Sequence, residues 1–200
     1  RITINSKDGG QFGAYLSLPP TGKGPGILLI QEIFGINQHI RDVADQYASD
    51  GFVVLAPDVF WRQEAGVDIG YDDESFEKGF ALMQGMDFPK AVEDLCVAAQ
   101  TLKALPQVNG KVASLGYCMG GMLSYMVGTT DGVVDASVCY YGGGIHTALD
   151  RAPQANVPML MHFAEKDGFI PMQAVEQIKD AFQNNSAVEI HTYPDVDHGF

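Results

Sequence analysis

Short, continuous apolar runs recur along the chain, and segments with helical spacing follow most of them. Runs of this kind are typical of strands buried on both faces of a sheet. The expected strands cover residues 2–5, 13–18, 27–30, 53–56, 111–115, 136–141, 158–163 and 187–193, and the expected helices cover residues 40–49, 89–105, 119–128 and 171–182. This alternation predicts an α/β protein with a mostly parallel, twisted sheet and helices on both faces.

Length and composition indicate one domain over residues 1–200. The chain is 46% hydrophobic, which suffices for one well-packed core, and it has no internal repeat, linker or low-complexity segment. Residues 58–86 are rich in acidic and aromatic side chains and are expected to be irregular.

The chain has a formal net charge of −13, which opposes binding to nucleic-acid phosphates and anionic lipid surfaces. No stretch reaches the length of a membrane span.

Cys96 and Cys139 are expected in the core, and the three cysteines show neither disulfide nor zinc spacing. A working thiol suits the reducing cytoplasm, although the chain begins at Arg1 and a removed targeting segment remains open. The glycosylation sequon at residues 184–186 is a common chance match.

The sequence Gly-Tyr-Cys-Met-Gly at residues 116–120 joins an expected strand to an expected helix. Its spacing matches the G-x-S-x-G nucleophile elbow of hydrolases, with a thiol in place of the hydroxyl. Glycines suit such a strained turn because no Cβ obstructs the neighbouring backbone. Cys118 is therefore predicted to be a nucleophile; the alternative is a buried structural cysteine in a glycine-rich turn.

A cysteine nucleophile needs a base and a group that orients the base. α/β-Hydrolases supply these in the chain order nucleophile, acid, histidine, and Cys118, Asp167 and His198 stand in that order after expected strands. We expect them to meet at the carboxyl edge of the sheet, where ligands bind. Glu165 competes for the role of the acid but lies closer to its strand, and Asp167 has the alternative of a solvated turn residue.

The other histidines suit the role of the base less well. His162 and His191 lie within expected strands, His39 opens a helix, and His146 follows three glycines in a loop. No pair has the H-x-x-x-H spacing of a helical metal site, so no metal is expected. His198 is the predicted base by elimination as well as by position.

A tetrahedral oxyanion needs preorganised N–H donors. One should be the backbone N–H of Met119, the residue after the nucleophile, and the other should come from the loop after an earlier strand. That loop covers residues 31–35, and its Ile33 N–H is the predicted second donor.

Several stretches together resemble the dienelactone hydrolase, or carboxymethylenebutenolidase, family. They are Gln-Glu-Ile-Phe-Gly-Ile-Asn at residues 31–37, Ala-Pro-Asp at 56–58, the elbow at 116–121, and residues 195–200. The resemblance runs from about residue 3 to the end of the chain. It implies an α/β-hydrolase fold without cofactor or metal, and a triad of Cys118, His198 and Asp167 that cleaves a small ester or lactone through a thioester intermediate.

The resemblance also implies a role for Glu32. The equivalent glutamate of the family pairs with the proton of the nucleophile in the resting enzyme, and substrate binding shifts it so that the thiolate forms. A carboxylate beside a thiol disfavours a standing thiolate and so protects it from oxidation. The alternative for Glu32 is a carboxylate at a helix N-terminus, favoured by the helix dipole.

Three features differ from the dienelactone-specific members of that family. Those members bind a substrate carboxylate with two arginines, whereas residues 71–86 hold only Lys78, Arg62 is the nearest upstream basic residue, and the chain ends at Phe200. Gly199 stands where they have a small hydroxyl residue. A closing helix usually follows, so residues 1–200 are expected to be a domain truncated at the C-terminus. The resemblance therefore predicts ester or lactone hydrolysis more firmly than dienelactone as the substrate.

Other functions could use the same residues. A non-catalytic or redox-sensing domain would need Cys118 as an exposed, easily oxidised thiolate, which Glu32 would suppress. A thioesterase or peptidase would need only a different pocket. The aromatic residues of the irregular segment either wall a pocket or pack on the core. They are Phe60, Trp61, Tyr71, Phe76, Phe80 and Phe88. The oligomeric state is not encoded in any pattern we recognise.

Overall fold

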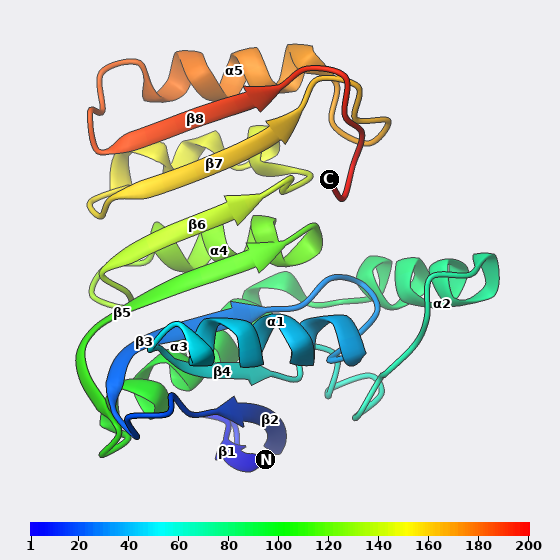
Figure 1. Ribbon diagram of the computed structural model, residues 1–200. Helices are drawn as coiled ribbons and strands as arrows, with labels where there is room; N and C mark the ends of the chain where they lie inside the picture. Colours follow the sequence, from blue (N-terminus) through cyan, green and yellow to red (C-terminus); the bar gives the residue numbers. More distant parts are fainter.

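The structure is a computed structural model that describes residues 1–200, and its eight strands form one twisted sheet (Figure 1). The strand order is β1-β2-β4-β3-β5-β6-β7-β8. The strands are β1 (Ile2–Asn5), β2 (Gln11–Ser17), β3 (Gly24–Ile30), β4 (Val53–Pro57), β5 (Val108–Tyr117), β6 (Ala136–Tyr140), β7 (Met159–Ala164) and β8 (Val188–Tyr193). Strands β3 to β8 are parallel and the first two are antiparallel. The predicted mostly parallel α/β fold is confirmed.

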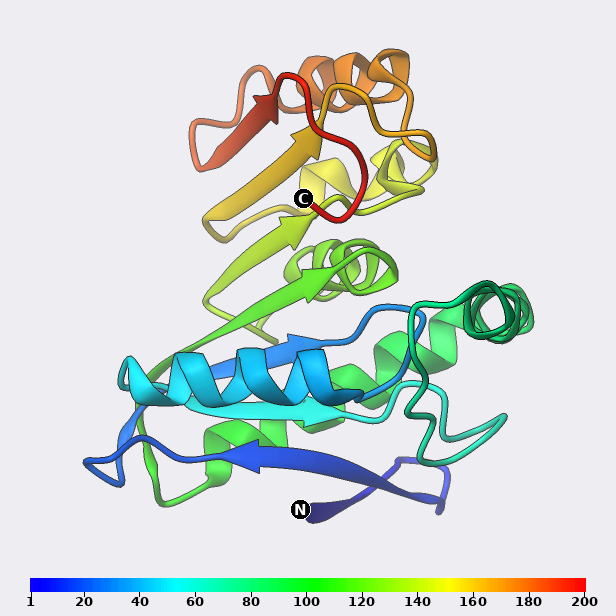
Figure 2. The same cartoon turned by 45° about the vertical axis from the view of Figure 1, so that its right-hand side comes forward.

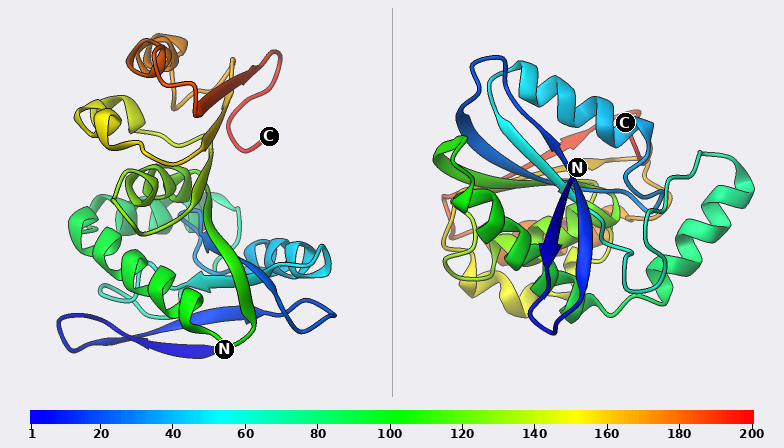
Figure 3. Two further views of the ribbon diagram at one scale, coloured as in Figure 1. Left: turned by 90° about the vertical axis from the view of Figure 1, so that its left-hand side faces the viewer. Right: turned by 90° about the horizontal axis from the view of Figure 1, so that it is seen from below.

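Helices cover both faces of the sheet. They are α1 (Gln38–Ser49), α2 (Asp73–Gln84), α3 (Phe88–Ala104), α4 (Met119–Gly128) and α5 (Met172–Phe182), with two short 3₁₀ helices, η1 (Ile145–Thr147) and η2 (Leu149–Gln154). With the sheet seen edge-on, α1 lies on one face and α3, α4 and α5 lie on the other (Figure 3, left). The four predicted helices are present, with ends that differ by at most two residues.

Helix α2 lies within residues 58–86, so the expectation that this segment is irregular was wrong. Asp72 caps the helix by accepting a hydrogen bond from the Ser75 N–H, and Asp73 and Glu74 stand in the first turn, where the helix dipole favours them. Only Gly79 is buried in α2. Phe76, Phe80 and Met83 lie at helical spacing on one side of the helix, but they remain partly exposed. In Figures 1 and 2 it projects beyond the carboxyl ends of the parallel strands.

The core is divided by the sheet. The largest cluster of buried side chains lies between the sheet and helices α3 and α4, and a smaller one lies under α1. Leu28, Leu29 and Ile30 of β3 are fully buried, as expected for a strand covered on both faces. Cys96 and Cys139 are buried in the core, as predicted. The parallel strands end at one common edge, where the candidate site lies.

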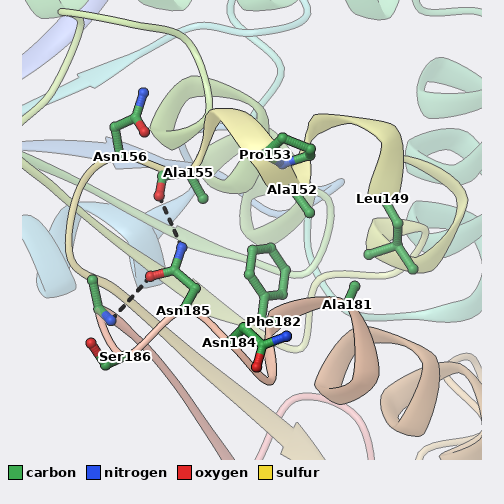
Figure 4. A pocket seen from close by; sticks show the side chains of 11 residues that line it. Leu149, Ala152, Pro153, Ala155, Asn156, Ala181, Phe182, Asn184, Asn185 and Ser186 are labelled. Carbon is green, nitrogen blue, oxygen red and sulfur yellow. Dashed lines mark hydrogen bonds between the residues drawn. The ribbon is translucent and has the colours of Figure 1, made fainter.

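A hollow at the amino ends of β7 and β8 has no titratable side chain. It lies between η2, the end of α5 and the turn before β8 (Figure 4). The Asn185 side chain donates to the Ala155 carbonyl at 3.0 Å and accepts from the Ala187 N–H at 3.1 Å, which ties that turn to the segment before β7. The lining residues are small, apolar or amide side chains, so this hollow is not the candidate site.

Candidate active site

The elbow holds Cys118 in a conformation that non-glycine residues rarely adopt. Its φ is 58° and its ψ is −120°, at the junction of β5 and α4. A Cβ at Gly116 would overlap the Gly120 carbonyl, and a Cβ at Gly120 would overlap the Ile30 carbonyl. The Cys118 N–H donates to the Tyr140 carbonyl at 3.0 Å. The turn is thus wedged between the ends of β3 and β6, which is why its glycines are needed.

His198 and Asp167 form a buried pair on the loops that follow β8 and β7. The distance from His198 Nδ1 to Asp167 Oδ2 is 2.7 Å. The other carboxylate oxygen, Oδ1, accepts hydrogen bonds from the Phe169 N–H at 2.7 Å and the Ile170 N–H at 3.1 Å. The Asp167 side chain is 1% exposed and that of His198 is 16% exposed. Asp167 is therefore held by three hydrogen bonds and is not a solvated turn residue.

Asp197 connects the loop that bears His198 to the loop that bears Asp167. Its Oδ1 accepts from the His198 N–H at 2.6 Å and from the Gly168 N–H at 3.1 Å. The Lys166 N–H also donates to the Val196 carbonyl at 3.0 Å. These bonds place the imidazole at the same edge of the sheet as the elbow. The sequence analysis did not single out Asp197, although an aspartate in a loop commonly accepts hydrogen bonds from nearby backbone N–H groups.

One pocket of about 280 Å³ brings the predicted residues together. Cys118, His198, Glu32, Ile33 and Met119 all line it, and Asp167 lies behind the histidine. Its other walls are mainly apolar: Phe34, Phe76, Phe80, Met83 and Phe169, with Gly143 and Gly144. Of the aromatic residues in the irregular segment, Phe76 and Phe80 therefore wall the pocket, while Phe60 packs in the core.

The Cys118 thiol is in an environment that keeps it protonated. Burial raises its pKa to about 12, and the negative charges of Glu32 and Asp167 add to the rise, while the Met119 N–H opposes it. No hydrogen bond joins the Cys118 sulfur to His198 or Glu32 in this structure. The resting site therefore holds a neutral thiol rather than a thiolate.

Glu32 is engaged by a tyrosine rather than by the thiol. Its Oε2 accepts a hydrogen bond from the Tyr71 hydroxyl at 2.7 Å, and that hydroxyl accepts one from Asn37 Nδ2 at 3.3 Å. Burial raises the pKa of Tyr71, so its hydroxyl stays a donor. Asn37 also caps α1 by accepting from the Ile40 N–H. Glu32 precedes this cap by five residues and is not in the first turn of the helix.

The Glu32–Tyr71–Asn37 chain is a feature that the sequence analysis missed. Tyr71 comes from the segment before α2 and lies 39 residues away from Glu32 along the chain. No local pattern links the two positions, because contacts between distant loops depend on the folded sheet edge. The only sequence signal is indirect: a tyrosine in an otherwise acidic segment.

Both residues predicted to supply oxyanion donors line the pocket. Met119 is the first residue of α4, where a backbone N–H has no intrahelical acceptor. Ile33 lies in the turn after β3, and both residues are 3% exposed. Gly79 of α2 packs directly against the Ile33 carbonyl, where a Cβ would overlap it. Helix α2 thus packs closely against the loop that bears Ile33 and limits its movement.

The other candidate groups lie away from the pocket. His162 of β7 stacks on Tyr140 with ring centroids 4.6 Å apart, and burial lowers its pKa. Arg62 is bound to Asp8 at 2.7 Å and to Asp94 at 2.8 Å and so is not free to meet a ligand. No group of three or more His, Cys, Asp or Glu side chains could hold a metal ion. No helix is long and apolar enough to cross a bilayer.

A Gly-x-Cys-x-Gly turn after β5, an aspartate after β7 and a histidine after β8, on this sheet, match the arrangement of the α/β-hydrolase class. A model of the dienelactone hydrolase family matches residues 12–200. The chain is 36% identical over 200 residues to a carboxymethylenebutenolidase of a Pseudomonas strain, covering 100% of this chain and 83% of that protein. It is 35% identical over 200 residues to carboxymethylenebutenolidase 1 of Cupriavidus pinatubonensis, covering 100% and 85%.

Among solved structures, one described as a putative dienelactone hydrolase from Klebsiella pneumoniae superposes with a TM-score of 0.85. It is 27% identical and covers 99% of this chain and 85% of that one. The chain belongs to the dienelactone hydrolase family, as its motifs predicted. It is therefore an enzyme of the ester and lactone hydrolase class.

Proposed function

We propose that Cys118, His198 and Asp167 form the catalytic triad of a hydrolase that cleaves small esters or lactones through an acyl-thioester intermediate. The observation that supports this most directly is the shared pocket. It contains an elbow cysteine and a histidine whose second ring nitrogen is held 2.7 Å from a buried carboxylate. The donors expected for an oxyanion, Ile33 and Met119, line the same pocket.

In the first half of the reaction the thiol loses its proton and the sulfur attacks the carbonyl carbon of the substrate. The C=O π bond opens and its oxygen becomes an oxyanion, which accepts hydrogen bonds from the N–H groups of Ile33 and Met119. Collapse of this intermediate re-forms the carbonyl and breaks the C–O ester bond. The imidazolium of His198 donates its proton to the leaving oxygen, and the acyl group stays on Cys118.

In the second half His198 takes a proton from water, and the resulting hydroxide attacks the thioester carbon. The same donors hold the second oxyanion until the C–S bond breaks. The thiolate recovers a proton from the imidazolium and the carboxylic acid leaves. Asp167 keeps the histidine in the tautomer with its proton on Nδ1 and stabilises the imidazolium.

Glu32 is proposed as the group that first receives the thiol proton. A thiol whose pKa is raised to about 12 does not ionise unaided at neutral pH. Glu32 lines the same pocket as Cys118 and is held by the Tyr71 hydroxyl. Rotation of the thiol toward Glu32 when substrate enters would let the carboxylate accept its proton. Glu32 would then pass this proton to His198, which gives the imidazolium that protonates the leaving oxygen.

The raised thiol pKa counts against a redox sensor. A sensor cysteine needs a lowered pKa and ready access to oxidants. Cys118 has the opposite environment, because burial and two nearby carboxylates suppress its thiolate. The small apolar pocket likewise favours small esters over peptides.

Substitution of Cys118 by alanine tests the proposal. Cys118→Ala should abolish turnover of p-nitrophenyl acetate, whereas Cys96→Ala, a change to another buried cysteine, should retain it. Mass spectrometry of the unmodified protein mixed with a slow ester should find the acyl mass on the peptide that contains Cys118. Undiminished hydrolysis by Cys118→Ala would refute the nucleophile assignment.

A further inference from the structure

No lysine or arginine among residues 1–200 lines the pocket around Cys118. The cations of the surrounding surface are already paired: Arg62 with Asp8 and Asp94, and Lys78 with Glu64 at 2.7 Å. A substrate carboxylate placed here would lose its hydration without gaining a counterion, which is strongly unfavourable.

The fixed charges near the nucleophile are negative. Glu32 lines the pocket and Asp167 lies behind His198, and both already raise the pKa of the Cys118 thiol. The same two charges would repel a carboxylate on the substrate. The neutral groups of an ester or lactone meet no such penalty.

Three phenylalanine rings that line the pocket form a continuous aromatic wall. Phe76 and Phe80 are one helical turn apart on α2, with ring centroids 5.9 Å apart and planes 12° from parallel. Phe76 also meets Phe169 of the loop after β7 at 6.2 Å. Phe169 in turn lies 5.1 Å from the His198 ring. The wall thus reaches from α2 to the histidine.

The wall is partly open to solvent although it is apolar. Phe76 is 37% exposed and Phe169 is 61% exposed, and both rank among the most exposed large hydrophobic residues of the protein. A ligand that covers them would remove apolar surface from water, which stabilises the complex. Flat rings stack well on such surfaces.

Helix α2 holds this wall in place relative to the reacting atoms. Gly79 lies between Phe76 and Phe80 on the helix and packs against the carbonyl of Ile33, where no Cβ would fit. Ile33 is a proposed oxyanion donor, so the aromatic wall and the oxyanion site are fixed to the same loop. A substrate group stacked on the wall would therefore hold the scissile carbonyl of that substrate close to the proposed oxyanion site.

We infer that this site takes uncharged esters or lactones that place a flat apolar group, such as an aromatic ring, against Phe76, Phe80 and Phe169, and that it disfavours substrates bearing a carboxylate there. The inference rests on the proposed hydrolase function and names the substrate class of that site. It assigns to the apolar surface of Phe76 and Phe80 the discrimination between uncharged and carboxylate-bearing substrates.

Two pairs of esters that differ in one carboxylate test the inference. Phenyl acetate and 4-acetoxybenzoate place the charge on the alcohol side, and phenyl benzoate and 4-(phenoxycarbonyl)benzoate place it on the acyl side. With each kcat/KM divided by the uncatalysed rate, the uncharged member should be favoured about tenfold or more in at least one pair. Equal or better turnover of the charged member in both pairs would overturn the inference and leave the hydrolase function standing.

A charge-reversing variant sharpens the test. Phe76→Arg should reduce the preference for the uncharged ester by about tenfold, because it supplies the missing cation. Leu18→Arg is the matched control: it adds the same charge at an exposed position after β2, at the opposite edge of the sheet, and should leave the preference unchanged. An equal change in both variants would show that net charge, and not the aromatic wall, sets the preference. Failure of the unmodified protein to hydrolyse any of the four esters would instead refute the proposed function itself.

Discussion

Cys118 lies where burial and nearby charge disfavour its ionised form, yet a nucleophile must ionise to react. The strained backbone of the elbow, with its φ of 58°, is maintained by close backbone packing on both sides. The thiol is thus held in a fixed position but stays protonated. Activation then has to come with the substrate, and Glu32 is the group placed to provide it.

The resting state of the thiol can be measured by its alkylation with iodoacetamide as a function of pH. Because burial and two carboxylates raise the pKa of Cys118 to about 12, the thiolate fraction should still be rising tenfold per pH unit at pH 10. Glu32→Gln removes one of the charges that raise this pKa, so alkylation at a given pH should become about threefold faster or more. A rate that levels off near pH 8 in the unmodified protein would contradict this assignment.

The same Glu32→Gln variant should lose ester hydrolysis while its alkylation accelerates. A merely structural glutamate would change neither rate while the fold is intact. Unfolding would also expose the thiol and speed its alkylation, so the variant has to retain the circular dichroism spectrum of the unmodified protein for the opposite directions to be diagnostic.

Asp167 is predicted to act by orienting His198. Asp167→Asn should lower kcat/KM by about 10³-fold, because an amide in this position favours the wrong imidazole tautomer. Glu165→Gln provides the matched control: Glu165 is exposed two residues earlier on the same loop, and its loss should leave kcat/KM within about twofold. Comparable losses in both variants would mean that the loop as a whole, and not the 2.7 Å contact, matters.

At the scale of elements, the site depends on how closely three backbone segments approach one another. The elbow passes between the ends of β3 and β6, and α2 rests on the turn after β3. In each place a glycine removes the Cβ that would keep the segments apart. The segments that carry the site residues therefore also carry the glycines that allow this close backbone packing.

The elbow glycines should be necessary for stability as well as activity. Gly120→Ala places a Cβ against the Ile30 carbonyl, and the resulting displacement should lower the free energy of unfolding by about 2 kcal/mol or more. Gly168→Ala, whose Cβ would meet no atom within 4 Å, should change it by less than about 0.5 kcal/mol. Urea denaturation followed by circular dichroism measures both, and equal values would contradict the packing argument.

For the whole molecule, the net charge of −13 adds a long-range repulsion to the local charges of the pocket. Salt screens such repulsion at distances beyond about 10 Å at 0.1 M. The kcat/KM for 4-acetoxybenzoate should therefore rise about twofold or more between 0.01 M and 0.5 M NaCl, while that for phenyl acetate stays constant. A parallel response of the two esters would show that salt acts on the enzyme rather than on the encounter.

Much of the fold could be predicted because its signals are local. Short, largely apolar runs mark β3, β4, β6 and β7, apolar spacing marks α3 and α5, and the elbow marks the junction of β5 and α4. Helix α2 was missed because its apolar stripe is short, with only Phe76, Phe80 and Met83 in an otherwise acidic segment, and because only Gly79 is buried. Its capping aspartate was present in the sequence, but a cap alone does not distinguish a helix from a turn.

The sequence by itself determined the sheet, the elbow and the chain order of Cys118, Asp167 and His198, since these depend on short motifs and on which residues follow strands. Only the tertiary structure decided what surrounds them. The 2.7 Å contact between Asp167 and His198, the Tyr71 hydroxyl on Glu32 and the phenylalanine wall all join segments far apart in the chain. Such contacts arise when parallel strands end at one edge and bring their loops together, and no local pattern records which side chains will then meet.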